Sequence, residues 1–322
     1  MALKISLKYR VIIKIIYCVG ATLGLFLFNY KLTRKRVKTS KYLLIYHKIL
    51  MIVLFTFGIK IVASFLMSTN FSTTSFSLNV HVFKNIMLMV VSFNAYYKIG
   101  SNHNDLNETI NEIIEIIEWI NKTNNNTVEM KKFWKILIKM CLIDNCLMIP
   151  IYIMFISIVG FNFLTILPEL YLIVLEYVVI FVANSLLVGV VALEYMFYEL
   201  NKMIKSTEKS FIMGNSYETR QLISNDELNN KLQSFSLVYS KISSCSKKVT
   251  NLFPSLSAVL LLYSLLNILL GILSFSKRFQ DNVKNIKFLF LSISVFMENF
   301  FNLIYLIYIC IGVEKEVSLK AR

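Results

Sequence analysis

The stretch Pro168–Tyr198 reads PELYLIVLEYVVIFVANSLLVGVVALEYMFY, and it decides the class of fold. A helix that crosses a lipid bilayer needs roughly 20 mostly apolar residues, and this stretch exceeds that length. Its apolar pattern continues beyond Tyr198 through Leu200, Met203 and Ile204. The stretch therefore predicts a membrane helix that extends past the membrane edge.

The composition of the whole chain is also typical of a membrane protein. Of the 322 residues, 56% are hydrophobic and only 16% are charged, whereas ordinary soluble domains have about 25% charged residues. A single core of this size cannot bury so much apolar side chain, and the composition equally excludes a disordered chain. Five cysteines without a C-x-x-C pair indicate neither a disulfide framework nor a metal site.

Five further stretches are long and apolar enough to cross a membrane, which makes six in all. The sequence therefore predicts an all-α fold, a bundle of helices that crosses the membrane several times. The six predicted spans are Tyr42–Ser68, Leu78–Tyr97, Phe133–Gly160, Pro168–Tyr198, Leu252–Phe275 and Ile286–Gly312.

The apolar stretch Val11–Phe28 is different, because it contains Lys14 and has basic residues on both sides. The segment Lys31–Lys41, which follows it, carries six Lys or Arg residues and no acid, so the positive-inside rule places it in the cytoplasm. We therefore expect Val11–Phe28 to be a helix that does not cross the membrane, but lies in its interface or packs on the bundle. Residues 1–41 then form a basic cytoplasmic segment, and residues 42–322 form one membrane domain.

The net charge of +15 would suggest a nucleic-acid surface if the protein were soluble. Here most basic residues lie in predicted cytoplasmic loops, so the charge indicates orientation, and no nucleic-acid partner is expected.

Asn70 begins a glycosylation sequon in the first predicted outer loop and is a possible site of modification. Asn107, Asn121 and Asn125 begin sequons in a predicted cytoplasmic loop, and we expect them to stay unmodified.

Two predicted cytoplasmic segments carry helical patterns of their own. His103–Ile120 places isoleucines on one face and glutamates largely off it, which predicts an amphipathic helix. Ser224–Glu227 resembles a capping box, and it opens a second pattern that runs into the predicted fifth span. We expect the fourth and fifth membrane helices to extend into the cytoplasm. Their apolar faces either cover one another within one subunit or form an oligomer interface.

The sequence contains no P-loop, no H-E-x-x-H and no other catalytic or metal-binding motif, so we expect neither an enzyme nor a bound metal or cofactor. Polar side chains within membrane spans are costly, and they are therefore candidates for function. A small-molecule site is expected to be a pocket lined by aromatic and a few polar groups. Helix–helix hydrogen bonding is the alternative role for each such residue. The candidate ligand-binding residues are Tyr152, Glu176, Tyr177, Tyr263, Asn267 and Glu298.

The order of these features resembles that of an insect gustatory receptor, a member of the seven-helix chemoreceptor superfamily. The best local match runs over Leu232–Phe275, where Val249, Asn251 and Phe253 fit the V-x-N-x-F lead into the fifth span. The stretch ALEYMFYELNKMI, which starts at Ala192, resembles the end of the fourth span in the family, and NLIYLIYICIGVEKE resembles the close of the sixth.

This resemblance implies a ligand-gated cation channel subunit in the plasma membrane of sensory neurons. Such subunits assemble as homo- or hetero-tetramers and open when a small-molecule tastant binds. The family also has a seventh helix with a T-Y…Q-F motif. No such motif follows Gly312 here, so the chain looks like a receptor truncated before its pore helix. A membrane transporter and a non-conducting membrane partner stay open as alternatives, which ligand-evoked current or saturable uptake would separate.

Overall fold

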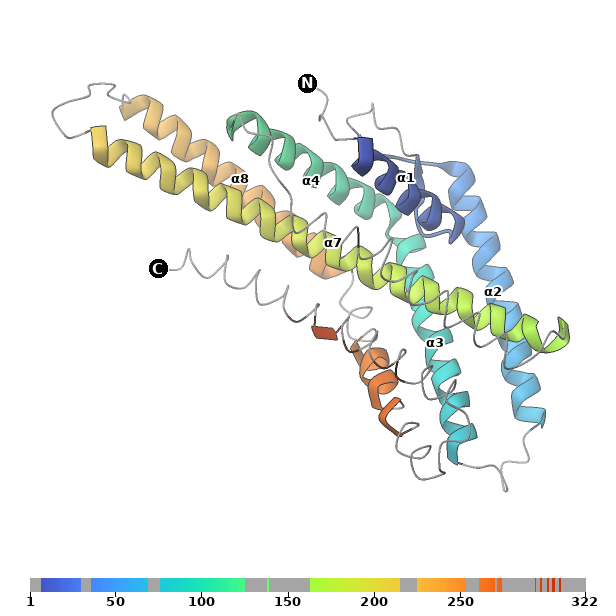
Figure 1. Cartoon of the computed structure of the whole chain (residues 1–322). Coiled ribbons are helices and arrows are strands. Elements are labelled where there is room, and N and C mark those ends of the chain that lie inside the picture. Colours follow the sequence, from blue (N-terminus) through green and yellow to red (C-terminus); the bar gives the residue numbers. More distant parts are fainter. Residues whose placement is uncertain are drawn as a thin grey trace.

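The chain forms a bundle of long helices in a computed structural model (Figure 1). The predicted spans Phe133–Gly160 and Ile286–Gly312 lie outside the described residues, except for isolated positions. The residues that the structure describes are 7–29, 36–68, 76–124, 163–214, 225–252, 261–269 and 271–273, with the single positions 138, 293, 296, 300, 303, 304 and 307.

Within these residues the fold is helical, as predicted, apart from one short pair of strands. The number of membrane spans and their orientation stay predictions. The elements are α1 (Leu7–Thr22), β1 (Phe28–Asn29), β2 (Lys38–Thr39), α2 (Lys41–Ser68), α3 (Phe76–Ser101), α4 (His103–Asn124), α7 (Phe163–Gly214) and α8 (Asn225–Leu252). An apolar helix without a label follows over Leu261–Leu273.

The helix α7 organises the bundle. It has 52 residues, so its length is about 78 Å at the usual rise per residue. One half of α7 packs on α2 and α3, and the other half packs on α4 and α8 (Figure 1). It begins five residues before Pro168, which lies in the second turn, where the missing N–H removes one intrahelical hydrogen bond. Its far end confirms that the apolar pattern past Tyr198 is helical.

Two helical stretches, Lys41–Ser64 and Leu170–Lys209, are long and apolar enough to cross a membrane. Only 17% of the most apolar 18-residue stretch of Lys41–Ser64 is buried. The core helix of a soluble protein would instead be mostly buried, so this helix has the surface expected of a lipid-facing one. α3 matches the predicted span Leu78–Tyr97 as a helix, and its crossing of the membrane stays a prediction.

The N-terminal helix ends earlier than the sequence predicts. α1 stops at Thr22, and the prediction that the apolar segment is helical as far as Phe28 is wrong. Gly24 adopts a positive φ of 68°, which favours glycine. The Leu25 amide donates to the Gly20 carbonyl at 2.8 Å, and the Gly24 amide donates to the Ala21 carbonyl at 3.0 Å. These two bonds form a Schellman motif, which stops the helix.

The turn after α1 is anchored by three aromatic side chains. Tyr46, Tyr96 and His47 donate hydrogen bonds to the successive backbone carbonyls of residues 22, 23 and 24, each at 2.7 Å. The last carbonyls of a helix have no partner within it, so these bonds satisfy groups that would otherwise need water. Tyr46 and His47 belong to α2 and Tyr96 to α3. The turn is therefore fastened to both helices.

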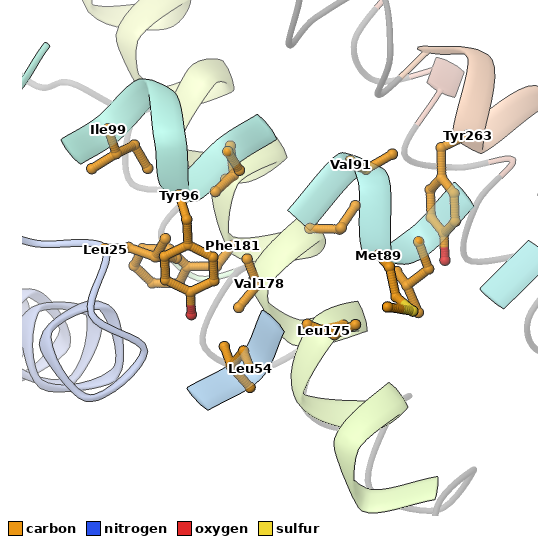
Figure 2. Close-up of a cluster of buried hydrophobic side chains, with 14 of the residues drawn as sticks. Leu25, Leu54, Met89, Val91, Tyr96, Ile99, Leu175, Val178, Phe181 and Tyr263 are labelled. Carbon is orange, nitrogen blue, oxygen red and sulfur yellow. The ribbon is translucent and has the colours of Figure 1, made fainter. Parts of the chain in front are cut away.

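The chain then packs on the bundle, which was one of the two expectations for this segment. Leu25 and Leu27 are almost fully buried in a core cluster shared with α2, α3 and α7 (Figure 2). β1 pairs with β2 in antiparallel register, with Phe28 opposite Thr39, and this hairpin leads into α2.

A second cluster forms where α4, α7 and α8 meet. Ile120 of α4, Met196 and Leu200 of α7, and Ile242 of α8 are all fully buried there. The amphipathic pattern of His103–Ile120 is thus confirmed, and the apolar faces cover one another within one chain. α8 begins directly after Ser224, where the capping box predicts a start.

The crossing of α2 with α3 and α7 requires a glycine at position 58. A Cβ on Gly58 would clash with Met89 and with the hydroxyl of Tyr171, which donates to the Leu54 carbonyl at 3.0 Å. We expect Gly58→Ala to destabilise the fold by about 1–3 kcal/mol, because overpacking shifts neighbouring groups. The measurement is thermal unfolding of the purified protein, followed by size-exclusion chromatography. Gly189→Ala is the matched control, because a Cβ there meets its nearest neighbour only at 4.0 Å. Equal melting temperatures for both variants would contradict the prediction.

Candidate ligand site and its link to helices α4 and α8

An ion pair joins α3 to α7 inside the apolar part of the bundle. Lys84 Nζ lies 3.2 Å from Glu176 Oε1, and the two side chains are only 22% and 25% exposed. The neighbouring residues Leu88 and Leu175 are almost fully buried in the core cluster. Charged groups in such surroundings are costly unless they are paired, so this contact constrains how α3 and α7 can sit.

Sequence reasoning selected Glu176 but did not connect it with Lys84. A usable signal was present, because both charges lie at a similar depth. Lys84 is six residues beyond Leu78 and Glu176 is eight residues beyond Pro168, each counted from the outer edge of its predicted span. At the rise of an α-helix these positions are about 9 and 12 Å deep. Single opposite charges at matched depth are therefore candidates for pairing.

Further polar contacts of α7 lie within two turns of this ion pair. Tyr171 donates to the Leu54 carbonyl of α2 at 3.0 Å. Ser92 of α3 donates to the Leu88 carbonyl at 2.8 Å and reaches the Leu175 carbonyl at 3.4 Å. α7 is thus bonded to both neighbouring helices over one short stretch. The contact of α7 with α2 and α3 is held by specific hydrogen bonds as well as by apolar packing.

Tyr263 and Asn267 lie one turn apart on the apolar helix Leu261–Leu273, and both are almost fully buried. Figure 2 shows Tyr263 beside α3, near Met89 and Val91, at the end of the core cluster opposite Leu25. Tyr263 thereby joins the cluster that also holds Leu175, the neighbour of Glu176.

The structure thus describes four of the six candidates: Glu176 and Tyr177 on α7, and Tyr263 and Asn267 on the apolar helix. Tyr263 and Leu175, the neighbour of Glu176, belong to the same apolar core cluster, which α3 shares. The candidates Tyr152 and Glu298 lie outside the described residues, as does the sequon residue Asn70. Asn85, next to Lys84, is a further buried polar residue that sequence reasoning did not select.

Comparison with known families identifies the kind of protein. Residues 13–318 match the model of the 7tm chemosensory receptor family. The chain belongs to this family. The match confirms the resemblance and, with the apolar helices, indicates a membrane protein with a chemoreceptor role. It is not a family of enzymes. No curated protein sequence matches the chain.

In this chemosensory receptor, an ionic contact joins the helices α4 and α8. Lys248 Nζ donates to Glu108 at 2.8 Å and to Glu112 at 2.6 Å. The thiol of Cys245, one turn earlier on α8, donates to the second carboxylate oxygen of Glu112 at 3.1 Å. Glu112 therefore accepts a bond at each oxygen, and these groups border the apolar cluster of α4, α7 and α8.

The ionisation of these groups follows from that geometry. Burial raises the pKa of Cys245 to about 12, and the nearby Glu112 carboxylate adds to this effect. Burial opposes ionisation of Glu112, but hydrogen bonds from Lys248 and Cys245 outweigh it and hold the pKa of the carboxyl below its usual value. A carboxyl with a depressed pKa stabilises the fold at neutral pH and loses that contribution only as the pH falls through its acid range.

The opposite side of α4 is bonded to the N-terminal hairpin. Asn111 accepts from the Val37 amide at 2.7 Å and donates to the Val37 carbonyl at 3.1 Å, as a neighbouring strand would. Asn107 Nδ2 donates to Thr39 Oγ1 at 2.6 Å, so the nitrogen to which a glycan would be attached is already engaged. α4 is therefore held between β2 and α8.

We expect the ion pair between Lys84 and Glu176 to show strong coupling in a double-mutant cycle. Lys84→Gln and Glu176→Gln should each lower the melting temperature, and the double variant should lose less than their sum. The coupling should be about 0.5–3 kcal/mol, because a half-buried charge that loses its ion-pair partner is destabilised.

The pair Arg36–Glu115 is the matched control, since it has the same 3.2 Å distance but exposed side chains (72% and 47%). Exposed pairs of this kind contribute roughly 0–1 kcal/mol. Equal coupling energies in the two cycles would contradict the prediction that partial burial strengthens the ion pair of Lys84 and Glu176.

We also expect Cys245 to resist alkylation. A thiol with a pKa of about 12 is ionised to only roughly one part in a thousand at pH 9, where an ordinary cysteine is mostly ionised. Maleimide labelling at pH 9, with peptide mass spectrometry, should modify the exposed Cys18 at least tenfold faster. After unfolding in SDS, both should react alike. Comparable rates for the two cysteines in the folded protein would contradict the structure around Cys245.

Proposed function

We propose that the chain is a gustatory receptor subunit, a ligand-gated cation channel that opens when a small-molecule tastant binds. The observation that supports this most directly is the ion pair of Lys84 and Glu176, which lies within a mainly apolar contact of α3 and α7. Tyr263 and Asn267 add buried polar groups from a third helix. Convergent polar groups among apolar and aromatic ones are the usual setting for a small ligand.

The ion pair also suggests how a ligand could favour the open state. A ligand shifts an equilibrium only if it binds one state more tightly than the other. A polar ligand that hydrogen-bonds to Glu176 or Lys84 can replace part of their mutual attraction, which reduces the cost of moving α7 against α3. An apolar ligand lacks this effect, so we propose a tastant with hydrogen-bonding groups.

The continuous helix α7 provides a route from this site to the intracellular helices. Glu176 and Leu200 are 24 residues apart on one helix, a distance of about 36 Å. A shift of α7 at Glu176 therefore also displaces the face that packs on α8 and α4. In this proposal the cluster of α4, α7 and α8 is the part that responds to the ligand.

We further propose a homo- or hetero-tetramer in the plasma membrane of sensory neurons, with the N-terminus in the cytoplasm. The resemblance to gustatory receptors supports the assembly and the location. The basic segment Lys31–Lys41, directly before α2, supports the orientation.

The test is ligand-evoked current in oocytes that express the chain alone or with a second chemoreceptor subunit. With a panel of tastants, we expect current when the second subunit supplies a pore helix, and a half-maximal concentration roughly tenfold higher for Glu176→Gln, as expected for the loss of one charge-assisted hydrogen bond. Glu115→Gln is the matched control, because it is the same substitution on the exposed surface of α4.

Other outcomes would contradict the channel. Saturable uptake without current would indicate a transporter. Stable surface expression without current or uptake would indicate a non-conducting membrane partner. An unchanged ligand response in Glu176→Gln would retain the channel and exclude this residue from ligand recognition.

A further inference from the structure

One face of α2 is exposed along its length, and it is basic at its N-terminal end and apolar beyond it. Its first two turns carry lysines, and the following turns carry only apolar residues on the same stripe. Residues spaced by three, four or seven positions share a helix face. The exposed residues of this stripe, in order, are Lys41, Ile45, Lys48, Ile52, Phe55 and Ile59.

The apolar part of the stripe is not covered by the described chain. Ile52, Phe55 and Ile59 are 58%, 48% and 52% exposed, which is high for large apolar side chains. In a membrane protein such a surface contacts the acyl chains of lipids. The stripe spans about 10 Å between Ile52 and Ile59 at the rise of an α-helix, which accommodates part of one acyl chain.

The lysines at the head of the stripe differ from the other cations nearby. Arg36 is paired with Glu115, and Lys248 is paired with Glu108 and Glu112.

Lys38, Lys41 and Lys48 are exposed and form no ion pair within the part of the chain that the structure describes. Lys41 and Lys48 are about 10 Å apart along the axis, and long lysine side chains can bend toward a common headgroup region.

The local structure holds these lysines in place. β2 contains Lys38 and pairs with β1, and the Ser40 amide donates to the Leu27 carbonyl at 2.8 Å directly before α2 begins. Asn111 of α4 fixes the backbone of Val37 by two hydrogen bonds. The positive charges are therefore presented from an ordered hairpin and helix.

We propose that this stripe binds an anionic phospholipid. The phosphate-bearing headgroup lies against Lys38, Lys41 and Lys48, and the acyl chains run along Ile52, Phe55 and Ile59. Charge complementarity favours this occupant over a second copy of the chain, because two copies joined at this face would bring unpaired lysines together. The proposal depends on the membrane location of the receptor and not on channel activity.

The test measures lipid selectivity of the full chain in symmetric vesicles of phosphatidylcholine, which makes the orientation of the protein irrelevant. Spin-labelled phosphatidylserine and phosphatidylcholine are the probes, and electron paramagnetic resonance gives the motionally restricted fraction of each. We expect the parent to prefer phosphatidylserine. Lys41→Gln/Lys48→Gln should reduce this preference by roughly 5- to 30-fold, as expected for two lysines close to an anionic lipid.

Two further variants separate charge from other effects. Lys41→Arg/Lys48→Arg should keep the preference, because it keeps both charges. Lys122→Gln/Lys209→Gln removes two exposed lysines from the intracellular helices α4 and α7 and should also keep it. Size-exclusion chromatography of each variant checks that it is folded.

Three results would overturn the proposal. The preference for phosphatidylserine could survive in Lys41→Gln/Lys48→Gln. These lysines would then contribute only to the orientation of the chain in the membrane. The preference could fall equally in the Lys122 and Lys209 control, which would indicate a diffuse effect of net charge. The Lys41 and Lys48 variant could instead change the oligomeric state without changing lipid preference, which would make the stripe a subunit contact. None of these readouts requires ligand-evoked current, so the channel proposal stands or fails separately.

Discussion

The arrangement of this receptor depends on the packing of one helix, α7, in two different surroundings. Near Leu175 it is buried against α2 and α3, and near Leu200 it is buried against α4 and α8. Because a helix is stiff along its axis, both contacts must be satisfied by one rotation and tilt of α7. Polar contacts on α3, such as Ser92 and Lys84, then select that rotation among the many that apolar packing alone would allow.

The parts of the fold that the sequence predicts correctly are those with local causes. The amphipathic period of α4, the start of α8 after Ser224 and the length of α7 past Tyr198 each follow from residues close together in the chain. The end of α1 at Thr22 was not predicted, although Gly24 gives a local signal. The apolar run Val11–Phe28 predicts one continuous helix, whereas a glycine with positive φ and the turn around it stop the helix at Thr22.

The candidate site was predictable only as single residues. Burial of Tyr263 and Asn267 agrees with their selection as polar groups within a span. The pairing of Lys84 with Glu176, however, joins residues 92 positions apart, and nothing in a single sequence specifies that α3 faces α7 at that depth. The bonds of Asn111 to Val37 were missed for the same reason, because a side chain that replaces a strand partner leaves no periodic pattern.

The contacts around α4 connect the two ends of the bundle. His47 bonds the turn after α1, and its Nε2 lies so near Gly100 that a Cβ there would approach it to 2.6 Å, at the point where α3 leads into α4. From α4, hydrogen bonds run to Thr39 of β2 on one side and to Lys248 of α8 on the other. A displacement of α7 and α8 therefore cannot leave α4 unaffected, and α4 in turn is tied to the hairpin that contains Lys38 and leads into the lysine-bearing start of α2. If an anionic lipid holds that hairpin in place, it also opposes movement of α4, so the proposed lipid and the proposed ligand would act on the same set of helices.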